Sequence, residues 1–310
     1  MSTTHKEQQS LAGTAMKSGM SGLFLSGFAR EAVDLASHLQ SVNACPICDS
    51  RGLNERGPVA LICSYPALRT QLMECRQCRH WFVTPMPSQE VLTSLYAQNS
   101  AFVVDQGWQG RKKNLTIPER YVIARESRRA RRRGNYLEIG VGAGLLFDHF
   151  QSRGYQCSGV EPGPWGRSRP GLVRAVEELN DDDYDVAVLA DVLEHLRDPR
   201  AMVHFVGQRM KSGTLYACFP NNQSLRARLA ARKWRMVRPF GHLHFFSKSS
   251  LTVMLASNGF RLRDLRRTDL AGGPLRSLVW PPREAIMRIF MLPTQRFWGD
   301  QWIVQAEKRP

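Results

Sequence analysis

Glu138-Ile139-Gly140-Val141-Gly142-Ala143-Gly144 is the stretch of sequence that decides the fold. It follows an apolar run that ends at Ile139 and precedes an amphipathic stretch, Leu145–Arg153, so the glycines lie on a turn from a strand to a helix. Residues without Cβ let such a turn bend sharply and approach a ligand, and the following helix offers free N–H groups. The stretch predicts a cofactor-binding turn, although many α/β proteins carry one glycine-rich turn for structural reasons alone.

The chain on both sides of this turn alternates between strands and helices. Helical periodicity extends over Arg200–Met210 and over Lys248–Asn258, which Gly259 terminates. Further apolar runs have the length of strands: Tyr155–Val160, Asp185–Ala190, Leu215–Pro220, Phe260–Leu265 and Asp300–Ala306. This alternation predicts an α/β fold with a mostly parallel sheet covered on both faces.

Four phrases carry a family resemblance. The first, residues 137–144, contains the form E-x-G-x-G-x-G at residues 138–144, whose third glycine comes one residue earlier than in the dinucleotide fingerprint. It resembles motif I of the class I S-adenosylmethionine (AdoMet) methyltransferases. With residues 159–162, 191–199 and 242–247, it is similar to the group that includes the ubiquinone-biosynthesis O-methyltransferases. The resemblance covers about residues 135–308 and implies a seven-stranded Rossmann-like sheet with the strand order 3-2-1-4-5-7-6.

The same resemblance implies AdoMet as cofactor. Glu161 ends the second strand, and its carboxylate can accept hydrogen bonds from both hydroxyls of a ribose. Relatives often place an Asp against the adenine where this chain has Ala175, so we expect the backbone of Val176 to contact the ring. The full set of expected cofactor-binding residues is Glu138, Gly140, Gly142, Gly144, Glu161, Val176 and Asp191.

One segment departs from the family pattern. Relatives have a helix after the acid of the second strand, whereas this chain has the short segment Pro162–Gly171, whose prolines and glycines forbid a regular helix. The adenine side of the pocket is therefore rebuilt. Trp165 is either a stacking platform for the adenine or a surface residue of a shortened loop.

Three histidines are candidates for a catalytic base. His195 follows a predicted strand at the carboxyl edge of the sheet, where open α/β folds bind ligands, and a neutral imidazole accepts a proton at pH 7. His242 and His244 follow the fifth strand and are further candidates for the base or for acceptor binding. The alternative for Glu194-His195 is that the pair only orients its loop by hydrogen bonds.

Four cysteines predict a structural zinc site. Cys45, Cys48, Cys75 and Cys78 form two C-x-x-C pairs, and four thiolates close a zinc tetrahedron without an open position for catalysis. Disulfides and a redox pair are the alternatives, and His80 is expected to be a bystander. The residues after Cys75 resemble the zinc ribbon that precedes some sugar and secondary-metabolite methyltransferases.

The 310 residues accommodate one α/β domain and a small additional module. We expect a partly disordered segment at 1–40, a zinc ribbon at 41–88, a helical connector at 89–133 and the AdoMet-binding domain at 134–310. An insertion at about 270–298 contains the amphipathic stretch Arg283–Leu292, which either packs on the sheet edge or forms a lid over an apolar or lipid-linked acceptor. No apolar run reaches membrane-spanning length, and we expect a soluble, cytoplasmic protein of unknown oligomeric state.

The charge distribution leaves two enzyme classes open. The net charge is +16, with +8 in residues 111–133 and +12 in residues 221–310, so an rRNA- or tRNA-modifying methyltransferase is an alternative. We favour a small-molecule acceptor, because aromatic residues are not interleaved with the arginines as stacking platforms would be. Arg125–Arg133 is then interpreted as the basic end of a helix. A third hypothesis is a catalytically inactive partner protein with this fold.

Overall fold

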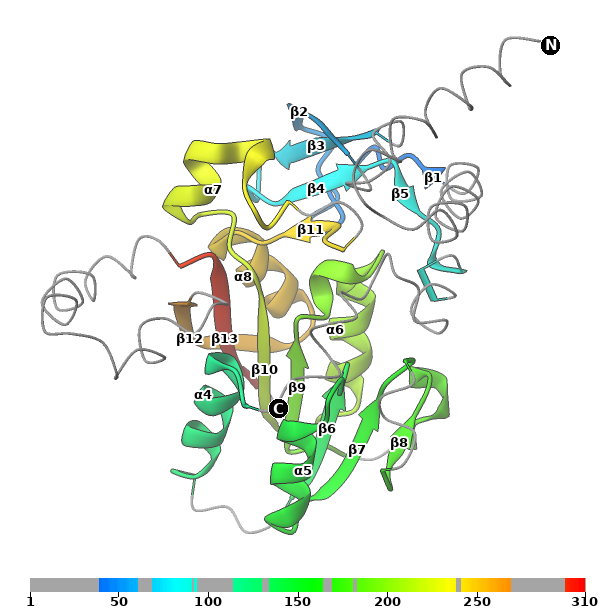
Figure 1. Ribbon diagram of the computed structural model, residues 1–310, viewed down its shortest axis with the longest axis vertical. Coiled ribbons are helices and arrows are strands. Elements are labelled where there is room, and N and C mark those ends of the chain that lie inside the picture. The colour runs from blue at the N-terminus through cyan, green and yellow to red at the C-terminus, as the bar shows by residue number, and fades with distance from the viewer. Residues whose placement is uncertain are drawn as a thin grey trace, which may run out of the picture.

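A seven-stranded sheet forms the centre of the structure (Figure 1). The computed structural model describes residues 39–60, 69–90, 92–93, 114–129, 134–163, 169–180, 183–237, 241–268 and 299–309. Three sequence-based expectations lie outside these residues and concern the segment 1–38, Trp165 and Arg283–Leu292.

The strand order of the central sheet is β12-β13-β10-β9-β6-β7-β8, which is the predicted order 3-2-1-4-5-7-6. The strands are β6 (Asn135–Ile139), β7 (Gln156–Val160), β8 (Leu172–Val173), β9 (Val186–Ala190), β10 (Gly213–Pro220), β12 (Phe260–Thr268) and β13 (Gln301–Lys308). Strand β13 runs antiparallel to both of its neighbours, whereas β6 to β10 pair in parallel. The α/β fold is thus confirmed.

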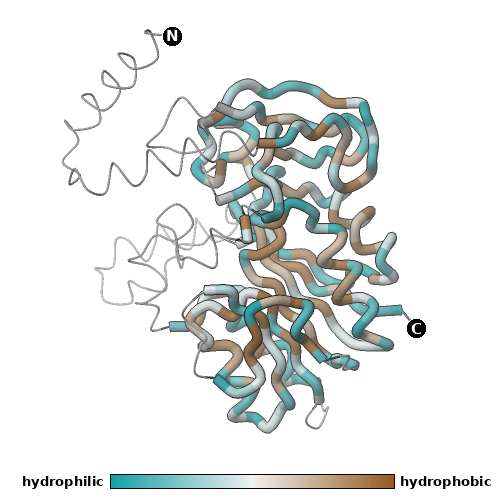
Figure 2. The backbone as a smooth tube through the Cα atoms, turned by 90° about the vertical axis from the view of Figure 1, so that its right-hand side faces the viewer, coloured by the Kyte–Doolittle hydropathy of each residue, from teal (hydrophilic) through white to brown (hydrophobic). Residues whose placement is uncertain are grey.

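Helices cover both faces of this sheet, because successive residues of a strand point to opposite faces. Tyr136 and Val188 pack in one buried cluster with α4 (Ile117–Glu126) and α5 (Leu145–Ser152). Their strand neighbours Leu137 and Leu189 pack in the cluster that contains α6 (Pro199–Gln208) and α8 (Lys248–Ser257). The central strands are accordingly hydrophobic along most of their length, as Figure 2 shows.

Local sequence signals set the helix ends. Asp198 accepts a hydrogen bond from the backbone N–H of Ala201 and caps α6, whose first residue is Pro199. Helix α8 begins with a capping box at Ser247, and Gly259, with φ of 76°, follows its end as predicted. Helix α4 ends at Glu126, earlier than the basic run suggested, since the chain continues as a turn through residues 127–129.

The amino-terminal module has its own antiparallel sheet, and one strand of that sheet comes from a much later part of the chain. Strands β2 (Leu53–Ala60), β3 (Arg69–Cys75) and β4 (Trp81–Thr84) pair in sequence order, and β11 (His244–Phe245) joins them beside β4. A separate pair consists of β1 (Leu39–Gln40) and β5 (Met86–Pro87). The module stacks on the end of the central sheet (Figure 1), and its buried residues share a cluster with the central core.

Helix α4 packs against the sheet through polar as well as apolar contacts. The Tyr121 hydroxyl donates to Asp264 over 2.8 Å, and the Tyr216 hydroxyl donates to Glu126 over 2.6 Å. Tyr121 thus takes part in the packing of α4 on the sheet. Among the helices described, none combines the length and apolarity that crossing a membrane requires.

A buried carboxylate ties the segment after β10 to the start of β13. The Asp300 side chain is fully buried and accepts hydrogen bonds from Ser224 Oγ at 2.9 Å and Trp234 Nε1 at 3.0 Å. Arg235 Nε donates to its other oxygen at 2.6 Å, and Arg226 lies at 3.3 Å. These donors come from α7 (Leu225–Ala230) and the residues around it, so one side chain holds this whole segment.

We predict that Asp300→Ala lowers the free energy of unfolding by about 3 kcal/mol, because it leaves several buried donors without their acceptor. Urea denaturation measures this loss. Asp183→Ala is the matched control: its carboxylate is about half exposed beside Lys211, and its loss is expected to cost less than about 1 kcal/mol. Equal losses in the two variants would contradict the anchoring role of Asp300.

Candidate functional site

The glycine turn after β6 has the backbone that the sequence predicted. Gly140, Gly142 and Gly144 all have positive φ, at 77°, 52° and 78°, a region that favours glycine. A Cβ on Gly140 would lie 2.6 Å from Val192 Cγ2, and a Cβ on Gly144 would overlap the Arg169 guanidinium. A Cβ on Gly142 would meet no protein atom within 4 Å. The turn is therefore closely packed at both ends and open at Gly142, where a ligand can approach the backbone.

Glu161 lies beside this opening. Its Oε2 accepts a hydrogen bond from the backbone N–H of Gly142 at 2.6 Å, and its Oε1 accepts one from Gly163 at 2.8 Å. Burial raises the pKa of this carboxyl, and the two backbone N–H groups oppose that shift. Each carboxylate oxygen keeps a second lone pair, so both oxygens can still accept from a vicinal diol.

The other expected cofactor residues lie around the same edge of the sheet. Glu138 is buried within β6 and accepts a hydrogen bond from the Tyr136 hydroxyl at 2.7 Å. Asp191 follows β9 with φ of 56°, and its Oδ1 accepts from Gln301 Nε2 at 2.8 Å. Val176 begins a short 3-10 helix, η4 (Val176–Glu178), and packs against the main core.

Arg169 is a residue that the sequence interpretation missed. Its Nε and Nη2 bind the two oxygens of Asp148 in α5 at 2.6 and 2.9 Å, and Nη2 also donates to the carbonyl of Ala143 at 2.9 Å. The guanidinium therefore clamps the glycine turn to the first turn of α5. No local pattern marks Arg169, because its partners Asp148 and Ala143 lie 21 and 26 residues earlier in the sequence.

Glu194, His195 and His242 form a second cluster near the carboxyl ends of β9 and β10. Glu194 and His195 lie in the 3-10 helix η5 (Leu193–His195), and His242 lies in the loop before β11. The imidazole centroids of the two histidines are 4.9 Å apart. Burial, and then the neighbouring Asp191 carboxylate, hold the pKa of Glu194 well above its usual range. The structure thus brings together two of the three predicted histidines.

His244 does not join this cluster. It is fully buried in β11, and its Nδ1 lies 3.1 Å from Nε2 of His80, which is also fully buried. Burial lowers the pKa of His244 to about 4 and that of His80 well below its usual range, so both rings are neutral at pH 7. His80, which the sequence predicted to be no zinc ligand, thus contacts β11 through His244.

The four predicted cysteine ligands meet at one point. The Cys45 and Cys78 sulfurs are 3.5 Å apart, as are those of Cys48 and Cys75, and all four sulfurs lie within 4.8 Å of one another. Zinc–sulfur bonds of about 2.3 Å place the sulfurs of a tetrahedral site roughly 3.8 Å apart. The thiols are free in the structure, and their spacing fits a tetrahedral metal ion better than two disulfides, whose S–S length is about 2.05 Å.

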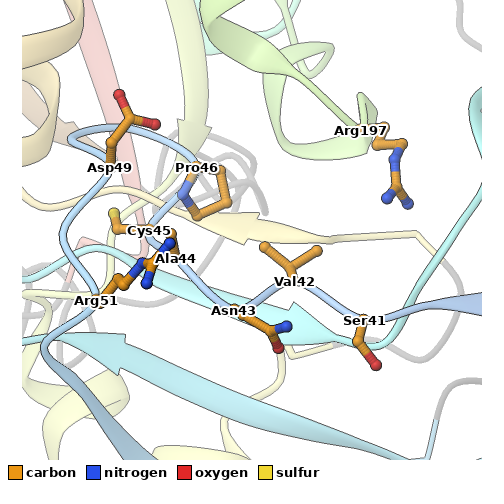
Figure 3. Close-up of a pocket in the computed structure, with 9 residues that line it drawn as sticks. All are labelled: Ser41, Val42, Asn43, Ala44, Cys45, Pro46, Asp49, Arg51 and Arg197. Carbon is orange, nitrogen blue, oxygen red and sulfur yellow. The ribbon is translucent and has the colours of Figure 1, made fainter.

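A cavity of about 560 Å³ lies next to the first cysteine pair (Figure 3). Residues 41–46 line one side, and Arg197 lies across from them. The Arg197 guanidinium donates to the carbonyls of Met86 and Pro87. The cavity is lined by neither the glycine turn nor the two clustered histidines, so it is distinct from the candidate cofactor site.

Comparison with known proteins gives one family match. Residues 118–265 match the family model of a methyltransferase domain. No curated protein matches the sequence significantly.

Three similar solved structures are methyltransferases. The Burkholderia thailandensis 1,6-didemethyltoxoflavin-N1-methyltransferase, solved with 1,6-didemethyltoxoflavin and S-adenosylhomocysteine, has 13% identity and a TM-score of 0.50, covering 76% of this chain and 98% of its own. An Archaeoglobus fulgidus protein described as a SAM-dependent methyltransferase has 21% identity and a TM-score of 0.43, covering 61% of this chain and 94% of its own. The Synechocystis magnesium protoporphyrin IX methyltransferase, solved with AdoMet, has 12% identity, covers 70% and 97%, and has a TM-score of 0.45.

We predict that Gly142→Val abolishes AdoMet binding and that Gly142→Ala weakens it more than tenfold, because the new side chain enters the space next to the turn. Calorimetry with AdoMet and S-adenosylhomocysteine measures both affinities. Gly259→Ala controls for backbone strain: it also places Cβ at positive φ, but close to Lys308 instead of the turn. Both Ala variants are expected to lose about 1 kcal/mol of stability. Unchanged affinity in Gly142→Val would contradict the site assignment.

Proposed function

We propose that this protein, whose residues 118–265 match the family model of a methyltransferase domain, transfers a methyl group from AdoMet to an oxygen of a small molecule, such as a sugar or secondary metabolite. The observation that carries the proposal is the glycine turn, which is open at Gly142 and has the Glu161 carboxylate at its side. AdoMet, when bound, supplies an activated methyl group on a sulfonium sulfur.

The residues around the turn fit the expected cofactor. The backbone at Gly140, Gly142 and Gly144 gives close access to the methionine part, and the free lone pairs of Glu161 match the two ribose hydroxyls. The backbone of Val176 is the proposed adenine contact. Arg169 supports this arrangement by holding the turn against α5. We also propose Glu138 and Asp191, at the same edge of the sheet, as cofactor-binding residues.

His195 is the residue that we propose as the base for an acceptor hydroxyl, with His242 as its neighbour. Both side chains are partly exposed, and they share the carboxyl edge of the sheet with the glycine turn. A base must reach the proton that it removes, and methyl transfer requires the acceptor oxygen to lie about 3 Å from the methyl carbon. His244 is fully buried and cannot reach an acceptor hydroxyl, so we do not assign it a role with the acceptor.

The distribution of positive charge favours a small acceptor over RNA. Asp264 and Glu307 pair with several arginines of β12, of α4 and of the turn after α4: Arg125, Arg129, Arg263 and Arg266. Strand β12 is the edge strand, four positions from β6, so its arginines lie roughly 19 Å from the glycine turn. Partly neutralised charge at this distance does not form a track that leads a nucleic acid to the proposed methyl donor.

The expected zinc ion belongs to the same proposal. Cys45, Cys48, Cys75 and Cys78 would hold it as four thiolates, which leave no open position for a substrate, so its role is structural. The zinc would fix the two turns that carry the cysteine pairs. Those turns pack against the main core, so we expect the metal to stabilise the end of the central domain as well as the ribbon.

We predict that labelled AdoMet transfers its label to a component of a small-molecule extract from the producing cells and not to total RNA. RNA association is expected to be weak, since binding that rests on six or more phosphate contacts falls by about 10³-fold or more between 50 and 200 mM salt. Gly142→Val is the inactive control. Stoichiometric, ribonuclease-sensitive label would replace the small-molecule proposal with RNA methylation. AdoMet binding by calorimetry with no labelled product in either fraction would favour an inactive partner protein.

We predict one zinc ion per chain, measured by elemental analysis of the full chain. Cys48→Ser should release the metal and lower the unfolding temperature, because metal binding and folding are coupled in such modules. Cys157→Ser is the matched control, as Cys157 lies outside the four-cysteine cluster. A zinc content below about a tenth of an equivalent, with oxidised pairs, would favour disulfides instead.

A further inference from the structure

The Glu194, His195 and His242 cluster has the composition of a metal site. One ligand atom from each of the three side chains lies within 4.8 Å of the other two. We propose that these residues bind one first-row divalent cation, such as Mn²⁺, Fe²⁺ or Zn²⁺, separate from the four-cysteine site.

Glu194 provides the first line of evidence. Its side chain is buried, and within the described part of the chain its Oε2 has no hydrogen-bond partner. A buried carboxyl oxygen without a partner is costly, because burial removes its water and no protein group replaces that hydrogen bond. A cation between Glu194 and the two imidazoles removes this cost.

A backbone carbonyl fixes the tautomer of His242. Its Nδ1 lies 2.8 Å from the carbonyl oxygen of Met236. A carbonyl can only accept, so Nδ1 carries the hydrogen and Nε2 is the ring nitrogen without one. Histidine ligands commonly donate their second ring N–H to a backbone carbonyl in this way, which fixes both the tautomer and the ring.

The backbone holds the two segments of the site together. The N–H of Leu243 donates to the carbonyl of Glu194 over 2.7 Å, so the residue after His242 is bonded to the helical turn that carries the other two ligands. A Cβ on Gly241 would lie 3.7 Å from Cε1 of His195, which shows how closely the loop passes over that ring. Metal–ligand bonds of about 2.1 Å require ligand atoms within roughly 4.2 Å of each other, so closing the site needs a movement of less than about 1 Å.

The ligand types select the class of cation. Two imidazoles and one carboxylate suit first-row transition metals and leave open positions, whereas Mg²⁺ and Ca²⁺ prefer oxygen ligands alone. An open position beside the cofactor turn would take an oxygen of the acceptor, and this part of the inference rests on the proposed function. With the cation bound, both imidazoles would be ligands and His195 would not act as the base. The metal would instead make the acceptor hydroxyl more acidic.

Titration of the full, zinc-loaded chain with Mn²⁺ tests the proposal, with free Mn²⁺ measured by electron paramagnetic resonance. We expect one Mn²⁺ per chain, and a loss of affinity of at least tenfold in both Glu194→Gln and His242→Asn. His204→Asn is the control: His204 is an exposed histidine of α6 that contacts Gln208, and its replacement should leave Mn²⁺ affinity unchanged.

Two outcomes would overturn the metal site. One is the absence of stoichiometric Mn²⁺ binding to the wild-type chain, and the other is wild-type affinity in His242→Asn. If Glu194→Gln fails to fold, His242→Asn decides, because His242 is only partly buried in a loop and its folding can be checked by thermal unfolding. AdoMet affinity, measured on the same samples by calorimetry, reports separately on the methyltransferase proposal.

Discussion

The parallel pairing of β6 with β7 on one side and β9 on the other is the constraint on which the candidate site depends. Ile139 pairs with Val160 and with Leu189, so the three strands reach the same edge of the sheet together. The chain then turns, and the N–H of Gly140 donates to the carbonyl of Val160 over 2.8 Å. This ladder of backbone pairs brings the glycine turn, Glu161 and the residues after β9 to one place.

Much of the fold could be predicted because it is encoded locally. The strand and helix periods, the proline and acid at the start of α6, and Gly259 after α8 are all signals within a few residues. Two elements had no such signal. Strand β8 has only two residues, and β11 is a strand because it pairs with β4, which lies some 160 residues earlier in the sequence. Pairing over that distance is decided by the packing of the whole chain.

Some residues of the candidate site could likewise be predicted from local sequence, and others could not. The glycines and Glu161 could be predicted, because their chemistry depends on a turn that their own sequence forms. The contribution of Arg169 could not, since it depends on a contact with Asp148, which lies 21 residues earlier, in α5. The three histidines looked equivalent in the sequence. Burial separates them: β11 places His244 inside the molecule beside His80, while the loop before it leaves His242 next to His195.

The place of β11 in the sheet of the amino-terminal module matters during biosynthesis. Strands β2 to β4 leave the ribosome early, but the strand that completes their sheet follows about 160 residues later. At 5 to 20 residues per second, this gap lasts about 10 to 30 s, during which β4 has an open edge able to pair with another chain. A zinc ion bound by the two cysteine pairs would keep the nascent amino-terminal module folded through that interval. Shortening the delay, for example by circular permutation, is therefore a rational route to higher soluble yield.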